Sequence, residues 1–278
     1  MRKKMRILFY LSCLSLAGMQ FTPDEAQGAS ARSSAITTWG NCGGGTREWW
    51  DDMCMRWRQT MGAKGWSQWW RNFENVTIEK YVDPDMAPWG SDKFNFDGGD
   101  AALICTHGSS NAGSGWAGSM HTQSNGECSL DANQMTIGKA NGNGNTRFLH
   151  LSSCNSAHYA HRLNWFTAAQ GRVHEIMGFH GWMYIGSSYV SEYGHVANNG
   201  FGKGVGKVWM DETYHEDHWY NSWKNVCPVS FGFGNTQAAA QNAHNERYND
   251  NWGDRAPSWM NTRYFKGCDP DGAGALPN

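Results

Sequence analysis

Residues 148–156 read Phe-Leu-His-Leu-Ser-Ser-Cys-Asn-Ser, an apolar run that ends at a cysteine between small polar residues. Four to eight apolar residues closed by small residues predict a buried strand. The next segment, 157–170, is expected to form a helix. Cys154 would then lie at the carboxyl end of a central strand, beside the first turn of a helix. Open α/β sheets bind ligands at this place, and backbone N–H groups there favour a thiolate.

A second block has the same form. Residues 100–109 read Asp-Ala-Ala-Leu-Ile-Cys-Thr-His-Gly-Ser, so a second apolar run leads to His107 and Gly108. Two neighbouring parallel strands would bring His107 close to Cys154. A cysteine and a histidine can together perform acyl transfer, because the thiolate attacks a carbonyl and the imidazole moves a proton to the leaving group. The backbone N–H groups of Gly108 and Cys154 are the expected donors to the oxyanion.

The rest of the chain alternates predicted strands and helices. Strands are expected at 75–82, 101–106, 173–180 and 227–233, and helices at 48–62, 201–212 and 237–249. Residues 108–145 form a long connection rich in Gly, Ser and Asn, with at most a short strand near 134–137. Connections of this length tend to be functional. Strands separated by helices predict an α/β fold with a central, mostly parallel sheet flanked by helices.

The two blocks resemble the His-Gly and Cys blocks of caspase-like cysteine peptidases, the clan of caspases, legumains, gingipains, clostripain and separase. Residues 103–108, Leu-Ile-Cys-Thr-His-Gly, are similar to the histidine block, and residues 148–156 to the cysteine block. The sequence Leu-Ser-Ser-Cys-Asn-Ser is most similar to that of bacterial caspase-like domains associated with repeat proteins. The resemblance covers roughly residues 75–235.

This resemblance implies a fold and a reaction. The fold is the caspase-hemoglobinase α/β sandwich. The reaction is hydrolysis of a protein or peptide substrate through a thioester acyl-enzyme, with His107 and Cys154 as the catalytic dyad. The amides of Gly108 and Cys154 would form the oxyanion site, and no cofactor is implied.

The first thirty residues are typical of a secretory signal peptide. Four basic residues precede a mostly apolar run at 7–19, and small residues gather near 26–31. The apolar run has about 13 residues, which is too short to span a bilayer. Cleavage near 26–31 would place the chain in the periplasm, at the cell surface or in the medium, with no membrane contact afterwards. The remaining domain organisation is expected to be a Trp-rich helical segment at 31–74, a caspase-like domain at 75–250 and an irregular tail at 251–278.

Export also bears on charge and on cysteine chemistry. Without residues 1–30 the chain holds 19 basic and 23 acidic side chains, a net charge of −4, which argues against nucleic acid as a partner.

Seven cysteines remain, and an oxidising compartment favours disulfides among them. The odd number leaves at least one thiol unpaired. Cys154 is expected to be such a thiol and Cys105 to be buried, while pairs are expected among Cys42, Cys54, Cys128, Cys227 and Cys268, with the connectivity left open.

Other features support alternatives. Sixteen tryptophans would suit a non-catalytic secreted protein that binds carbohydrate or another surface, although tryptophans packed against the sheet are the simpler interpretation. The histidine pairs 158/161 and 215/218 could share a metal ion, but neither completes a His-Glu-x-x-His motif. Short acidic stretches at 97–100 and 269–272 could help hold a structural calcium ion, although both are too short for an EF-hand loop.

Overall fold

A computed structural model of the chain describes residues 28–40, 42–45, 47–72, 76–124, 127–139, 144–216 and 224–278. For residues 70–72 and 121–124 it describes the backbone only. Nearly all of the predicted signal peptide therefore lies outside the described residues. Ala31 is fully buried in the first strand, so cleavage after Ala31 would truncate that strand.

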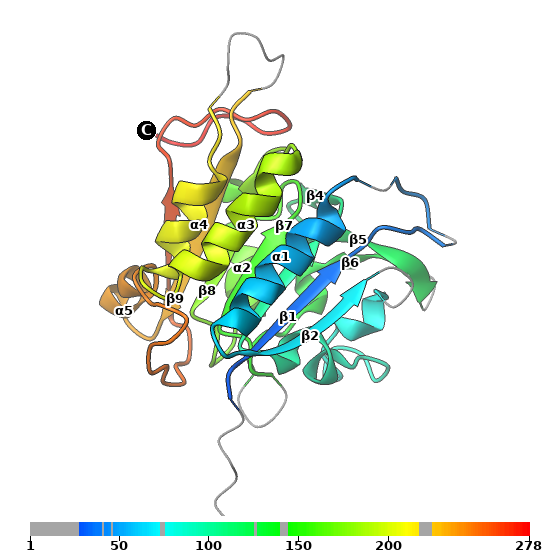
Figure 1. The fold of residues 1–278 in the computed structure, drawn as a ribbon, viewed down its shortest axis with the longest axis horizontal. Coiled ribbons are helices and arrows are strands. Elements are labelled where there is room, and N and C mark those ends of the chain that lie inside the picture. The colour runs from blue at the N-terminus through cyan, green and yellow to red at the C-terminus, as the bar shows by residue number, and fades with distance from the viewer. Residues whose placement is uncertain are drawn as a thin grey trace, which may run out of the picture.

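A seven-stranded sheet runs through the centre of the molecule, in the order β10-β9-β8-β7-β3-β1-β2 (Figure 1). Its strands are β1 (Ser30–Ala35), β2 (Ser67–Asn72), β3 (Ala101–Cys105), β7 (Phe148–Ser152), β8 (Glu175–His180), β9 (Cys227–Gly234) and β10 (Trp259–Tyr264). Five neighbouring strands, from β2 to β8, are parallel, and β9 is antiparallel to both β8 and β10. The prediction of a mixed α/β fold with a mostly parallel central sheet is confirmed.

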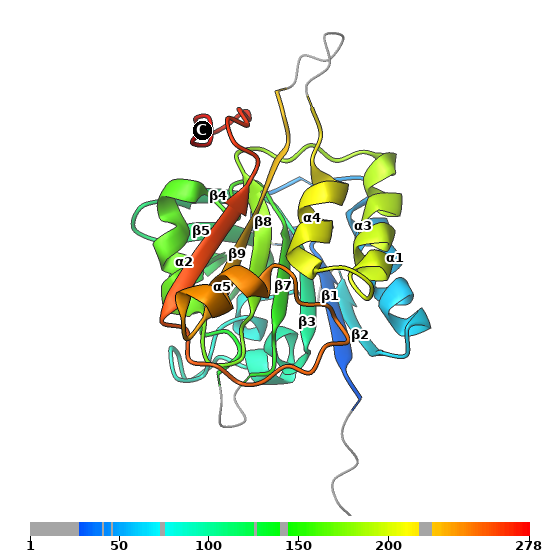
Figure 2. The ribbon, with the colours of Figure 1, turned by 90° about the vertical axis from the view of Figure 1, so that its left-hand side faces the viewer.

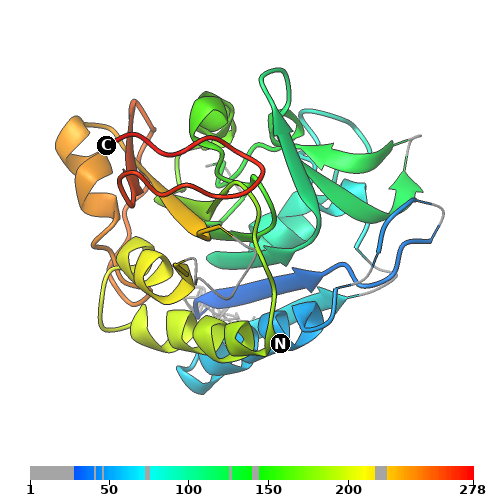
Figure 3. The ribbon, with the colours of Figure 1, turned by 90° about the horizontal axis from the view of Figure 1, so that it is seen from above.

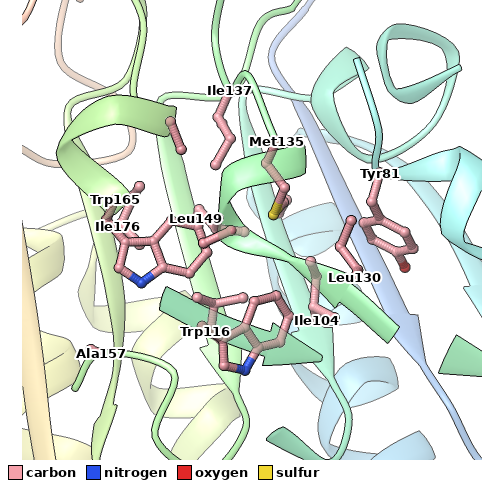
Figure 4. Close-up of a cluster of buried hydrophobic side chains, with 14 of the residues drawn as sticks. Tyr81, Ile104, Trp116, Leu130, Met135, Ile137, Leu149, Ala157, Trp165 and Ile176 are labelled. Atoms are coloured by element: carbon pink, nitrogen blue, oxygen red, sulfur yellow. The ribbon is translucent and has the colours of Figure 1, made fainter. Parts of the chain in front are cut away.

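Helices cover both faces of this sheet. They are α1 (Trp50–Ala63), α2 (Arg162–Ala168), α3 (Ser187–Asn199), α4 (Val205–Thr213) and α5 (Gln237–Ala243), with short 3-10 turns η2 (Ile78–Lys80), η3 (Asp92–Phe94), η4 (Phe96–Gly98), η5 (Ala132–Gln134) and η6 (Tyr159–His161). Helices α1, α3 and α4 lie together on one face, and α2 lies on the other (Figures 2 and 3). Each face has its own apolar core. Figure 4 shows the core on the α2 face, where the rings of Trp116 and Trp165 stack with their centroids 5.8 Å apart.

The long connection before β7 is more ordered than its composition predicts. It forms a small antiparallel sheet from β4 (Gly108–Asn111), β5 (Gly115–Ser124) and β6 (Glu127–Asp131). The β4–β5 turn is tight because the Asn111 side chain accepts hydrogen bonds from two backbone N–H groups and Gly115 adopts a φ of 68°. The Gly and Ser residues of β4 to β6 hid their strand pattern in the sequence. The prediction of a short strand near 134–137 is wrong, because η5 ends there.

The amino-terminal segment is not purely helical, which corrects the prediction for 31–74. Helix α1 agrees with the helix expected at 48–62, but β1 and β2 belong to the central sheet. The sequence of β1, Ser-Ala-Arg-Ser-Ser-Ala, lacks an apolar run and so gave no strand pattern. Its buried Ala31 and Ala35 lie beneath α1, and their small side chains let the helix pack close to the strand.

Three further predictions need correction. The strand expected at 75–82 is absent from its described part, where η2 forms instead. The helix expected at 157–170 is interrupted, because residues before Arg162 form turns held by the buried Ser156 hydroxyl. The tail expected at 251–278 contains β10, which pairs with β9 along its whole length.

Two disulfides link distant parts of the fold. Cys42–Cys128 joins the segment before α1 to β6, and Cys227–Cys268 joins β9 to the chain after β10. Cys54, Cys105 and Cys154 lie outside these two bonds, so the prediction that Cys154 is not bridged is confirmed. Disulfides persist in oxidising compartments, which agrees with the expected export.

A buried polar network joins α4 and α5 to the sheet. The Glu175 carboxylate is fully buried and accepts from the Gly206 N–H at 2.8 Å, the Ser230 hydroxyl at 2.8 Å and His244 Nδ1 at 2.8 Å. A buried carboxylate is tolerated only when it is paired and hydrogen-bonded. Glu175 therefore determines how α4 and α5 seat on β8 and β9.

We expect Glu175→Ala to lower the free energy of unfolding by about 3–5 kcal/mol, because three buried partners lose their acceptor. The control is Lys207→Ala on α4, which removes an exposed ion pair with Asp211 and should cost less than about 1 kcal/mol. Urea unfolding followed by circular dichroism measures both. Equal losses for the two variants would show that the network does not stabilise the fold.

Candidate functional site

The two sequence blocks meet at the carboxyl ends of two central strands of the sheet. β3 and β7 are adjacent and parallel, with Cys105 opposite Ser152, so His107 and Cys154 each follow a strand end by two residues. Both side chains line one small cavity of about 60 Å³. Among the described residues no hydrogen bond joins them directly, and the cavity has roughly the volume of two water molecules. The thiol and the imidazole therefore border a common space large enough for a small polar group.

The His107 ring is held on several sides. Its Nε2 lies 2.6 Å from the Gly45 carbonyl oxygen, so Nε2 carries the proton and donates it to that oxygen. The ring also packs on Trp39 and against the edge of Trp50, with centroids 5.2 and 4.9 Å away. This arrangement leaves Nδ1 as the nitrogen able to accept a proton from a thiol.

The Cys154 thiol lies half-buried over the segment after β8. Its Sγ is 3.3 Å from the Met183 N–H, which donates to it, and 3.7 Å from the Met183 carbonyl oxygen. Cys154 does not start a helix, which corrects the prediction, because α2 begins only at Arg162. A turn follows instead, with Asn155 in the left-handed region at φ 54°. The Met183 N–H takes the place of the expected helix terminus.

Burial favours the neutral form of both groups. It lowers the pKa of His107; the hydrogen bond to Gly45 opposes this shift and the nearby charge of Arg47 adds to it. Burial also raises the pKa of Cys154, while the Met183 N–H and Arg47 act in the opposite direction. A neutral imidazole can accept a proton from a thiol, so this pair is capable of proton transfer.

The two residues whose amides are expected to bind an oxyanion, Gly108 and Cys154, line one cleft. Gly108 stands opposite Gly118 in the β4–β5 ladder, and the preceding His107 carbonyl accepts from the Ser119 N–H. In an antiparallel ladder, hydrogen-bonded and non-hydrogen-bonded residue pairs alternate. Because the 107/119 pair is hydrogen-bonded, the 108/118 pair is not, and the Gly108 N–H points away from β5. Within the described residues the Cys154 N–H has no hydrogen-bond acceptor on the backbone.

Position 108 also requires glycine. A Cβ there would lie 2.1 Å from the Ser153 hydroxyl and 2.5 Å from the Cys154 carbonyl oxygen. The histidine and cysteine loops therefore touch at Gly108, which fixes the distance between the two strand ends.

A larger cleft of about 630 Å³ opens beside the dyad. The segment 182–185 and Trp49 line it with aromatic and aliphatic groups, and Arg47 and Glu48 supply charges of opposite sign at its exposed rim. Trp182 is half exposed. The cleft and the small cavity adjoin each other, because both are lined by Arg47, Cys154 and residues 183 and 185.

Three functional groups escaped the sequence analysis: the Gly45 carbonyl, the Met183 amide and the Arg47 side chain. The first two are backbone groups and carry no sequence pattern. Arg47 lies before α1, in a segment far from either motif block, and nothing in its sequence neighbourhood marked it.

Other predicted sites have protein partners. His158 and His161 stack at 4.4 Å, and His161 Nδ1 hydrogen-bonds to the Ser110 hydroxyl, while His218 lies outside the described residues. Asp97 accepts from the Gly138 and Thr146 N–H groups. In the part of the chain that the structure describes, no group of three or more His, Cys, Asp or Glu side chains is arranged to hold a metal ion.

The acidic stretch near the carboxyl terminus is also engaged. Asp271 accepts from the Tyr184 hydroxyl and from the Lys224 N–H, and Asp269 pairs with the Lys224 side chain. These contacts connect the tail to the segment that borders the cleft.

Most of the described tryptophans serve the core. Six are buried: Trp50, Trp57, Trp66, Trp116, Trp165 and Trp209. Four more are partly buried and pack against the two apolar cores: Trp39, Trp49, Trp89 and Trp252. Trp182 and Trp259 are each 50% exposed, and they lie on different elements. Packing against the sheet therefore accounts for most of the aromatic content.

Comparison with known proteins finds no family model that matches the chain and no significantly similar curated protein. Within the described residues no helix is both long enough and apolar enough to cross a membrane.

We expect alkylation of Cys154 by iodoacetamide in the native protein to reach half its maximal rate above about pH 8.5, the ordinary cysteine pKa, because burial raises the pKa of this thiol. Arg47→Ala should move this midpoint to still higher pH, since a positive charge that favours the thiolate is lost. The control Lys207→Ala, on a distant exposed side chain, should leave it unchanged. A midpoint near pH 6 would instead indicate a resting thiolate–imidazolium pair.

Proposed function

We propose that this protein is an exported cysteine peptidase of the caspase-like type, with His107 and Cys154 as its catalytic dyad. The observation that carries the proposal is the placement of both residues, two positions beyond adjacent parallel strands, around one cavity. A mostly parallel sheet with helices on both faces is also what the caspase-hemoglobinase sandwich requires. Substrate class and fold family rest on the resemblance of the two blocks.

The reaction follows from the charges and donors of the site. His107 Nδ1 takes the Cys154 thiol proton, and the thiolate attacks the scissile carbonyl in the small cavity. The Gly108 and Cys154 N–H groups stabilise the oxyanion. The imidazolium then protonates the leaving amine, and water hydrolyses the thioester with the imidazole acting as base.

The Gly45 carbonyl orients the base. It accepts the Nε2 proton, which leaves Nδ1 as the nitrogen that can take up a proton, and it stabilises the imidazolium when that forms. Triad peptidases commonly use a side chain for this task. Here a backbone carbonyl does the same work, so only two side chains carry the chemistry.

The cleft suits an extended peptide. Segment 182–185 runs along it without regular secondary structure and passes Cys154 at Met183. A peptide bound along this segment would place a carbonyl next to Sγ and its side chains against the aromatic and aliphatic wall. The net charge of −4 argues for this substrate class over nucleic acid.

Cys154→Ala, Cys154→Ser and His107→Ala should each reduce kcat/KM for peptide hydrolysis at least about a thousandfold, because the thiolate and the imidazole act as one unit. The double variant should be barely slower than either single variant. Turnover of a peptide library by the purified exported protein measures this, with circular dichroism to verify folding.

His195→Ala is the matched control, because His195 is an exposed histidine on α3 outside the site, and it should retain full activity. Equal cleavage by wild type and Cys154→Ala would place the chemistry elsewhere. A folded wild type that cleaves nothing, including after limited proteolysis to activate it, would favour the non-catalytic Trp-rich binding protein.

A further inference from the structure

Two other cysteines lie against each other beneath the site. Cys54 is on α1 and Cys105 ends β3, and their Sγ atoms are 2.7 Å apart. Both are buried, with exposures of 3% and 0%. Two unbonded sulfur atoms do not pack this closely, whereas a disulfide needs only a further approach to about 2.05 Å. The two sulfur atoms are therefore already close to bonding distance.

A pair of hydrogen-bonded thiols accounts for this geometry less well. The Cys54 S–H is directed to the Ser34 carbonyl oxygen at 3.4 Å, so only the Cys105 hydrogen could lie between the sulfurs. A weak S–H donor does not draw two sulfur atoms to such a distance. The surrounding core, which includes Trp50, Met53 and Tyr193, offers no other partner to Cys105 among the described residues.

We propose that Cys54 and Cys105 form a third disulfide in the exported protein. Two thiols lose two protons and two electrons, and a disulfide of an oxidoreductase or of a small-molecule thiol pool accepts them and becomes two thiols. Because both sulfurs are buried in the folded chain, the bond forms before α1 docks on the sheet. The other two disulfides agree with folding in a compartment that holds such oxidants.

The bond would have two consequences. It leaves Cys154 as the single thiol among the seven cysteines beyond residue 30. It also links α1 covalently to the strand that ends two residues before His107. Trp50, at the start of α1, supports the His107 ring with its edge, so the disulfide would maintain that support.

The test is a thiol count that does not depend on peptidase activity. The exported protein is unfolded in guanidinium with iodoacetamide and without reductant, and adducts are counted by intact mass. Wild type should carry one adduct, on Cys154, and Cys154→Ala should carry none. Three adducts on wild type and two on Cys154→Ala would overturn the proposal.

A variant locates the bond. Cys54→Ala should carry two adducts, the new one on Cys105 by peptide mapping, because its partner is gone. Cys54→Ala/Cys105→Ala should return to one adduct and melt about 5–15 °C below wild type. A double variant with an unchanged melting temperature, or a Cys54→Ala variant with Cys105 still blocked, would contradict the proposed pair.

Discussion

The parallel pairing of β3 with β7 is the constraint on which the site depends. Cys105 lies opposite Ser152, so a slip of one residue would move His107 and Cys154 apart and turn their side chains to different faces. Gly108 adds a second constraint, because the two loops beyond the strands are in contact there and leave no room for a Cβ. The strand register brings His107 and Cys154 to the same height along the two strands. The contact at Gly108 keeps the two loops that carry them close together.

Burial has opposite effects on the two members of this pair. It lowers the pKa of the His107 imidazole and raises the pKa of the Cys154 thiol. Both shifts disfavour a thiolate–imidazolium pair in the resting protein. The Gly45 carbonyl favours the imidazolium, and the Met183 N–H favours the thiolate; both are backbone groups fixed by the fold. The exposed Arg47 favours the thiolate but disfavours the imidazolium. In the proposed reaction, the Cys154 thiol would therefore lose its proton only when a substrate carbonyl is bound beside it.

How much the sequence could predict varied with the kind of interaction. β3 and β7 were predictable because a buried central parallel strand needs a continuous apolar run, and the residues after such strands form the site edge. β1 was not, because its place between two strands and under α1 favours alanine and serine, a composition shared with loops. The Gly45 carbonyl and Met183 amide were beyond prediction, since any residue type supplies a backbone group.

The layer formed by α1 explains why the amino-terminal segment is rich in tryptophan. Trp50 supports His107, Trp57 packs against the buried His150 in β7, and both rings lie in the same core as Cys54 and Cys105. Large rigid rings fill the space that the small side chains of β1 leave above the sheet. Packing thus explains most of the composition that first suggested a binding surface.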